Sequence, residues 1–128
     1  MLNKSQHINF LATSNATKAR EFYENILGLD FISENQFAIV FESRGTMLRI
    51  QKVEKVNPHE YTVLGWRVDD IGKEVRGLSK RGVRFSRYAG MDQDEIGIWI
   101  APSKAKIAWF ADPDGNILSL TEFESTEI

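Results

Sequence analysis

The chain has 128 residues, of which 42% are hydrophobic and 27% are charged, a composition typical of one globular domain spanning residues 1–128. Its 16 basic and 18 acidic residues are scattered and give a formal net charge of −2, which argues against a nucleic-acid partner because no basic block could neutralise a run of phosphates. There is no cysteine, which excludes disulfides and thiolate chemistry, and no apolar run approaches the ~20 residues of a membrane span, so we expect a cytoplasmic protein with no membrane segment.

The first half of the chain predicts a strand, a helix and then three strands. Residues 8–12 read as a buried strand, and Ser14 or Asn15 offers a side-chain oxygen that can cap a following helix. In that helix apolar residues recur every three or four positions, and Gly28 supplies the left-handed residue that ends it. The three strands are predicted at residues 31–33, 37–41 and 47–51, with turns at 34–35 and 43–45.

The second half repeats this order. A strand is predicted over residues 61–68, Asp69 and Asp70 form a capping signal, and a weaker helix follows and ends at Gly82. Further strands are predicted at residues 84–87, 98–101, 106–111 and 117–122. The pattern predicts an α+β fold of two βαβββ modules, about 5–54 and 59–124, although two such stretches also occur by coincidence in other α+β proteins.

Two short motifs connect this order to a known family. Residues 22–29 read FYENILGL and resemble the FY-x-x-x-LGL helix end of the vicinal-oxygen-chelate superfamily, which contains glyoxalases, bleomycin-resistance proteins and extradiol dioxygenases. Residues 112–116 read DPDGN and resemble a turn of the same proteins, although Asp-Pro-Asp-Gly is also an ordinary type I turn. The resemblance covers residues 7–123 and implies that the modules form a curved mixed sheet around a functional cup, with the helices on the outer face.

The resemblance also indicates where a metal would bind, because metalloenzymes of this family place His or Glu on four strands of the cup. The matching places fall at His7 or Ile8, Arg49, Val63 and Ser119. Alternation favours His7 toward the cup, with Ile8 and Phe10 toward the helices. Because an arginine has no lone pair to offer and its charge repels a cation, we expect no metal site and no cofactor.

Alternation also predicts the faces of two further strands. It sends Leu48 and Ile50 toward the helices and Arg49 and Gln51 into the cup. On the strand at 61–68 it sends Leu64, Trp66 and Val68 toward the helices and Tyr61, Val63, Gly65 and Arg67 into the cup. Arginines beside apolar walls can hold a carboxylate or phosphate, so we expect an anionic small-molecule ligand.

The predicted ligand-binding residues are Arg49, Gln51, Tyr61, Arg67, Trp99 and Ser119. Arg49 is the expected anchoring charge, and Trp99 or Trp109 offers a stacking wall for a flat ligand. Alternatively, Arg49 pairs with an acidic residue of the other module or of a second subunit, and the Arg67 guanidinium is solvated at a sheet edge. In the same alternative, both tryptophans belong to the core.

The segment 88–97 is long and acidic and has a glycine near each end. It suits a mobile loop over the cup, with Met91 as an adaptable apolar contact, and it equally suits a plain solvated connection.

These observations favour a metal-independent small-molecule binding protein. The alternative is a glyoxalase-type lyase or isomerase that acts on an activated carbonyl compound through His7 and Glu122, although alternation points Glu122 away from the cup. A third interpretation is a partner-binding or structural domain whose cup is filled by its own side chains. Many proteins of this fold pair their modules across two chains, so a homodimer is one prediction and pairing of the modules within one chain is the alternative.

Overall fold

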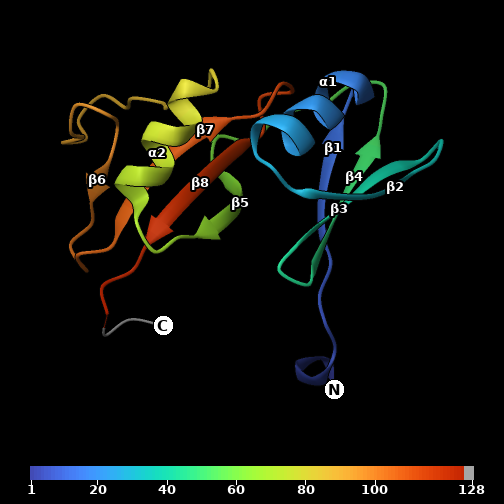
Figure 1. The fold of residues 1–128 in the computed structure, drawn as a ribbon, viewed down its shortest axis with the longest axis horizontal. Coiled ribbons are helices and arrows are strands. Elements are labelled where there is room, and N and C mark those ends of the chain that lie inside the picture. The colour runs from blue at the N-terminus through green and yellow to red at the C-terminus, as the bar shows by residue number, and fades with distance from the viewer. Residues whose placement is uncertain (126–128) are drawn as a thin grey trace. The chain divides into compact units, whose positions relative to one another are not determined.

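The computed structural model describes residues 1–125 and divides the chain into two compact units, one from Met1 to Pro58 and one from His59 onward (Figure 1). Each unit has a strand, a helix and three further strands in chain order, and the strands of each unit form one four-stranded sheet. The predicted α+β class and the two βαβββ modules are therefore confirmed. No helix within residues 1–125 is long and apolar enough to cross a membrane.

The first unit contains a short 3₁₀ helix η1 (Leu2–Lys4), strand β1 (Asn9–Thr13), helix α1 (Ala16–Glu21), a π-helical turn η2 (Phe22–Ile26), and strands β2 (Asp30–Glu34), β3 (Ala38–Ser43) and β4 (Thr46–Lys52). The strand order is β1-β4-β3-β2. Strand β1 runs parallel to β4, and the other neighbours are antiparallel.

Capping and turn residues set the boundaries of these elements. The Asn15 side chain accepts a hydrogen bond from the Lys18 backbone N–H at 3.1 Å and so caps α1, and Gly28 with a φ of 77° follows the helical segment. Arg44 and Gly45 both have positive φ values, 48° and 82°, which are the values that a tight hairpin between β3 and β4 needs.

The core of the first unit lies between its helix and one face of its sheet. Leu48 and Ile50 are buried on this face, as the alternation predicts, and the Tyr23 ring from η2 lies 5.9 Å from the Phe41 ring on β3. The prediction for Phe10 and Ile8 is wrong, because both are exposed while Leu11 is buried. Strand β1 is therefore turned over relative to the prediction, and Phe10 lies on the face opposite the helix.

The second unit contains strand β5 (Thr62–Arg67), helix α2 (Ile71–Lys80), and strands β6 (Trp99–Ile100), β7 (Lys106–Ala111) and β8 (Ile117–Glu122). The strand order is β5-β8-β7-β6, with β5 parallel to β8 and the other pairs antiparallel.

Helix α2 covers one face of this sheet. The Asp70 side chain accepts from the Lys73 backbone N–H at 3.1 Å and caps the helix, which confirms the predicted capping signal. Ile71 and Val75 are buried, and the helix packs against β7 and β8. Gly82, with a φ of 97°, lies just beyond the end of the helix, as predicted.

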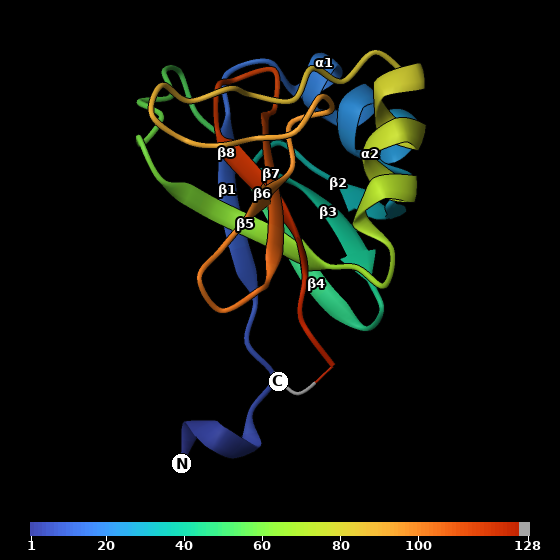
Figure 2. The same cartoon turned by 90° about the vertical axis from the view of Figure 1, so that its left-hand side faces the viewer.

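The prediction of a strand at residues 84–87 is wrong. Only an isolated bridge joins Phe85 to Phe110, and the chain then runs as a long connection to β6, drawn in yellow to orange in Figure 2. The Ser86 N–H donates to the Trp109 carbonyl of β7 at 2.7 Å, but the Gln93 side chain bonds the Ser86 carbonyl at 2.9 Å and the Tyr88 N–H at 2.8 Å, so the ladder with β7 does not continue. The predicted strand at 98–101 is correspondingly short, since only Trp99 and Ile100 pair with β7.

Candidate functional site

Each sheet has a face opposite its helix, which we call its open face. In the second unit, α2 packs on the side of Leu118 and Leu120, so the alternate residues of β8 point to the open face. The pairing register places two rows of residues across this face, the first Trp99, Ile107, Thr121 and Arg67, and the second Trp109, Ser119 and Gly65. Three of the predicted site residues, Trp99, Ser119 and Arg67, thus share one surface.

Aromatic rings gather at one side of this open face. The rings of Trp99 and Trp109 lie 6.1 Å apart at an angle of 38°, and the Tyr88 ring meets Trp109 edge-on at 5.6 Å. All three side chains are at least partly exposed. The cluster supplies a flat apolar surface on which a planar molecule can stack.

Ser119 lies in the middle of the same face and is buried, with 7% of its surface exposed. Its two neighbours across the sheet are Trp109 on β7 and Gly65 on β5. A Cβ atom at Gly65 would lie 2.7 Å from the Ser119 Oγ, so the serine hydroxyl lies over the space that a side chain on β5 would fill.

Arg67 closes the first row at the β5 edge. Its guanidinium carbon lies 5.2 Å from the centre of the Phe123 ring, a cation–π contact that leaves the guanidinium N–H groups available to other acceptors. Tyr61 precedes β5, is 63% exposed, and stacks on His59 with ring centres 4.8 Å apart. The structure does not bring Tyr61 into either row of the open face.

The open face of the first unit carries Arg49 and Gln51. Arg49 on β4 pairs with Phe10 on β1 and with Val40 on β3, so its guanidinium projects from an apolar row. Phe10 is 54% exposed, and Met47, two residues before Arg49 on the same face, is 37% exposed. This face therefore combines one cation with exposed apolar surface.

Neither arginine has an acidic partner within the described part of its own unit. Within residues 1–125, no ion pair includes Arg49 or Arg67. The alternative in which Arg49 pairs with an acidic residue of the other module or of a second subunit stays open.

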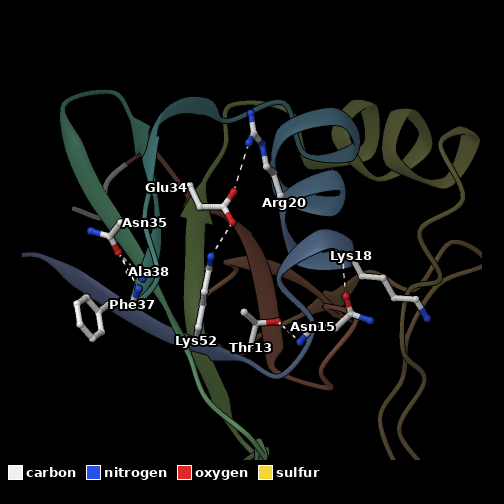
Figure 3. A network of polar contacts seen from close by, with 9 residues as sticks. All are labelled: Thr13, Asn15, Lys18, Arg20, Glu34, Asn35, Phe37, Ala38 and Lys52. Atoms are coloured by element: carbon white, nitrogen blue, oxygen red, sulfur yellow. Dashed lines mark hydrogen bonds and ion pairs between the residues drawn. The ribbon is translucent and has the colours of Figure 1, made fainter.

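The ion pairs of the first unit lie elsewhere, around Glu34 (Figure 3). Its carboxylate lies 2.7 Å from Lys52 Nζ and 3.3 Å from Arg20 Nη1, and Arg20 also stacks on Phe31 at 3.7 Å. The hydrogen bond from Lys52, opposed in part by burial, lowers the pKa of Glu34 below its ordinary value of 4.5. This cluster joins α1 to β2 and β4 and serves the fold.

The metal positions implied by the family resemblance fall on residues that do not form a ligand set. His7 precedes β1 and is exposed, and the turned-over strand gives the open face to Phe10, so a histidine ligand on this strand is not supported. No three His, Asp or Glu side chains of the described part of the chain lie together as a group that could hold a metal. Arg49 and Ser119, at two further places, offer a cation and a hydroxyl. These residues do not fit a divalent cation.

Glu122, the carboxylate of the lyase alternative, has another role. Its Oε1 accepts a hydrogen bond from the Ile71 N–H at 3.0 Å, and its Oε2 lies 3.8 Å from Lys106 Nζ. The side chain therefore lies on the α2 side of the sheet, as alternation predicts, and caps a helix.

The segment 88–97 is held by internal hydrogen bonds. Gln93 Nε2 donates to the carbonyls of Ser86 and Gly97 at 2.9 and 3.0 Å, and Asp94 Oδ1 accepts from the backbone N–H groups of Ile96 and Ile98. These bonds fix the base of the segment from which the Tyr88 ring reaches Trp109.

A separate hollow of about 510 Å³ lies beside the start of α2. Its lining includes Asp70, Asp94 and Glu122, whose carboxylates already accept backbone hydrogen bonds. Trp99 borders the hollow as well as the aromatic cluster. We place the candidate site of the second unit on its open face, because three carboxylates of the hollow, those of Asp70, Asp94 and Glu122, are already bonded to the backbone.

Sequence reasoning missed three contributors to these faces. Tyr88 lies in a segment with no strand pattern, and only the fold brings it to Trp109. Phe10 was assigned to the wrong face, because a strand with Phe10, Leu11 and Ala12 in succession shows no clear apolar alternation. The role of Gly65 depends on the register with Ser119, which alternation within one strand cannot reveal.

Comparisons with known proteins agree with this architecture. A model of the Glyoxalase/Bleomycin resistance protein/Dioxygenase superfamily matches residues 4–120. A member of that superfamily from Sphaerobacter thermophilus DSM 20745 is 25% identical, with a TM-score of 0.74 over 95% of this chain and 99% of that one. No curated protein matches the sequence significantly.

Two more distant structures share the fold. A bleomycin resistance determinant encoded on the transposon Tn5 is 19% identical, with a TM-score of 0.73 over 94% of this chain and 99% of that one. A lactoylglutathione lyase from Agrobacterium tumefaciens is 14% identical, with a TM-score of 0.71 over 92% of this chain and 93% of that one. At these identities the likeness concerns the fold alone.

Proposed function

Because the chain belongs to the Glyoxalase/Bleomycin resistance protein/Dioxygenase superfamily, we propose that it is a metal-independent protein that binds an anionic small molecule. The observation that carries the proposal is that Arg49 and Arg67, on the two open faces, form no ion pair within residues 1–125. A guanidinium that stands among apolar side chains is well suited to a carboxylate or phosphate, because its N–H groups bond two oxygens at once.

The aromatic cluster supports a flat apolar body for this ligand. Trp99, Trp109 and Tyr88 form a continuous set of ring contacts on the open face that also carries Arg67. Stacking on such rings tolerates different ring systems, whereas the arginine selects for negative charge. The proposal keeps Arg49, Gln51, Tyr61, Arg67, Trp99 and Ser119 as ligand-binding residues, with Tyr61 placed ahead of β5 and outside the two rows of the open face.

A glyoxalase-type lyase or isomerase remains the alternative, since the family contains both binding proteins and enzymes. Its residue basis is weaker than that of the binding role. Glu122 is engaged with Ile71 and Lys106 on the α2 side of its sheet, and His7 is exposed ahead of β1. A cytoplasmic location and a homodimer, both expected from the sequence, belong to the same proposal, and sedimentation of the purified protein measures the second.

Calorimetric titration with 2-naphthoate and with its neutral amide tests the proposal. We expect the acid to bind about 10-fold or more tightly than the amide, because hydrogen bonds between charged groups contribute about 1.5–3 kcal/mol. Arg67→Ala and Arg49→Ala should reduce this preference. Arg84→Ala is the matched control, because Arg84 is exposed and has no ion pair in the described chain. Equal binding of acid and amide in the wild type, or no saturable binding of either, would contradict the proposal.

A further inference from the structure

We propose that Gly65 positions the Ser119 hydroxyl to hydrogen-bond a polar group on the rim of a flat ligand stacked on Trp109. The preferred ligand class is then an aromatic acid that carries a second, uncharged polar group on its ring. The inference rests on the proposed function, which it narrows from any anionic molecule to this class. It also assigns a role to Gly65, a residue with no side chain of its own.

The first step is the state of the Ser119 hydroxyl. Ser119 is 7% exposed, and no hydrogen bond within residues 1–125 involves its side chain. A buried hydroxyl without a partner loses its hydrogen bonds to water and gains none in return, so such groups are uncommon in the interior of proteins. The hydroxyl lies on the open face between Trp109 and Gly65, where a ligand atom can supply the missing partner.

The second step is the direction of the hydroxyl. A Cβ atom at Gly65 would lie 2.7 Å from the Ser119 Oγ, well inside the usual contact distance, so the present position of the oxygen requires glycine at this place. The backbone of Gly65 is ordinary strand, and its φ is not among the positive values of the chain, so the requirement for glycine here is spatial. Gly65 therefore acts as a positioning residue for Ser119.

The third step is the spacing of the groups on the sheet. Trp109 and Ser119 are direct neighbours on β7 and β8, which places them about 4.8 Å apart across the strands. Arg67 lies on β5, the strand next to that of Ser119, two residues beyond Gly65, which is the direct partner of Ser119. With a strand spacing of about 4.8 Å and a two-residue rise of about 6.7 Å, Arg67 and Ser119 are about 8 Å apart. A two-ring acid can span this distance, with a ring hydroxyl at Ser119, the hydroxyl-bearing ring against Trp109, and the carboxylate at the far end of the ring system directed to Arg67.

The test compares 2-naphthoate with 6-hydroxy-2-naphthoate, whose hydroxyl lies across the ring system from the carboxylate, by calorimetric titration of the full chain. We expect the hydroxylated acid to bind the wild type about threefold to tenfold more tightly, the range of one neutral hydrogen bond. In Ser119→Ala the ratio of the dissociation constants of the two acids should fall to about one. In Gly65→Ala it should fall likewise, because the new methyl group forces the hydroxyl into another rotamer.

Matched variants separate this effect from general damage to the sheet. Thr121→Val removes the next hydroxyl along the same face of β8 and should leave the ratio as in the wild type. Adding Gly65→Ala to Ser119→Ala should not change the ratio further, because glycine acts only through the hydroxyl. An unchanged ratio in both single variants would overturn the inference and leave the proposed function intact. If the wild type binds neither acid up to about 5 mM, the proposed function itself fails.

Discussion

The carboxylate of Glu122 caps the second helix, since its Oε1 accepts a hydrogen bond from the Ile71 N–H at 3.0 Å. Glu122 is the last residue of β8 and Ile71 the first of α2, so one side chain joins the end of the central strand to the start of the helix. A negative charge at this position also interacts favourably with the partial positive charge of the helix N-terminus.

Glu122→Ala should lower the free energy of unfolding by about 1 kcal/mol, the usual cost of losing a helix cap, without weakening the binding of an aromatic acid. Urea denaturation and calorimetric titration of the same variant measure the two effects. Glu124→Ala is the control, because Glu124 is exposed and has no partner in the described residues. Loss of binding in Glu122→Ala at unchanged stability would instead support the lyase alternative.

The pH dependence of stability should report the ion pairs of Glu34. Lys52 and Arg20 lower the pKa of Glu34, so the folded state holds its carboxylate charged more strongly than the unfolded state does. This contribution is fully present above the ordinary value of 4.5 and is lost as the pH falls through the lowered pKa of the folded protein. Glu34→Gln should therefore destabilise the protein at neutral pH and flatten the acid limb of its stability curve.

The measurement is the free energy of unfolding from urea titrations at a series of pH values. Glu42→Gln is a suitable control, because Glu42 is exposed on the neighbouring strand β3 and forms no ion pair in the structure as described. If Glu34→Gln loses unfolding free energy at low pH in the same way as the wild type, the Glu34 carboxylate does not contribute to the pH dependence of stability.

Gln93 should determine the stability of the connection between α2 and β6. Its side chain makes three backbone hydrogen bonds, to Ser86, Tyr88 and Gly97. Gln93→Ala leaves the partly buried carbonyls of Ser86 and Gly97 unpaired, which should cost about 1–3 kcal/mol, and it frees the exposed Tyr88 amide, whose hydrogen exchange should become faster. Because Tyr88 contacts Trp109, binding of aromatic acids should weaken as well. Asp92→Ala, next to it in the chain and without a partner among residues 1–125, should change neither.

The elements that sequence reasoning placed correctly are those with strong local signals. Asn15 and Asp70 cap helices at the predicted positions because capping depends on a few adjacent residues. The DPDGN turn closes as expected, with the Gly115 N–H donating to the Asp112 carbonyl at 3.0 Å and the buried Asn116 bonded to Asp112. The burial of Leu48 and Ile50 follows from the alternation of apolar and polar residues from Leu48 to Gln51 in β4.

The errors occurred where no short sequence signal decides the outcome. Residues 84–87 contain the right residue types for a strand and Ser86 bonds Trp109, but the Gln93 side chain bonds the Ser86 carbonyl and the Tyr88 N–H, so the pairing does not continue. Phe10 is apolar but lies on the open face, so the rule that apolar residues of a strand face the core places it on the wrong side. The unpartnered hydroxyl of Ser119 became visible only with the register that sets it beside Gly65.

Titration of chelator-treated protein with Ni²⁺, Zn²⁺, Mn²⁺ and Fe²⁺ should show no stoichiometric binding. The reason is the chemistry of the residues present. Arg49 occupies a place where a ligand would need a lone pair, and Ser119 offers only a neutral hydroxyl. His7 is exposed ahead of β1, and the described residues supply no cluster of acidic or histidine side chains that would complete a site with it.

Calorimetry of the wild type and of His7→Ala distinguishes the outcomes of that titration. Binding that is weak and identical in both proteins would be nonspecific and would agree with the metal-independent proposal. One-to-one binding with a Kd of about 1 μM or tighter, lost in His7→Ala, would contradict it, because such affinity requires several ligands in fixed geometry. In that case His7 would have to approach further donors on binding, and the chain would have to be tested as a lyase or dioxygenase.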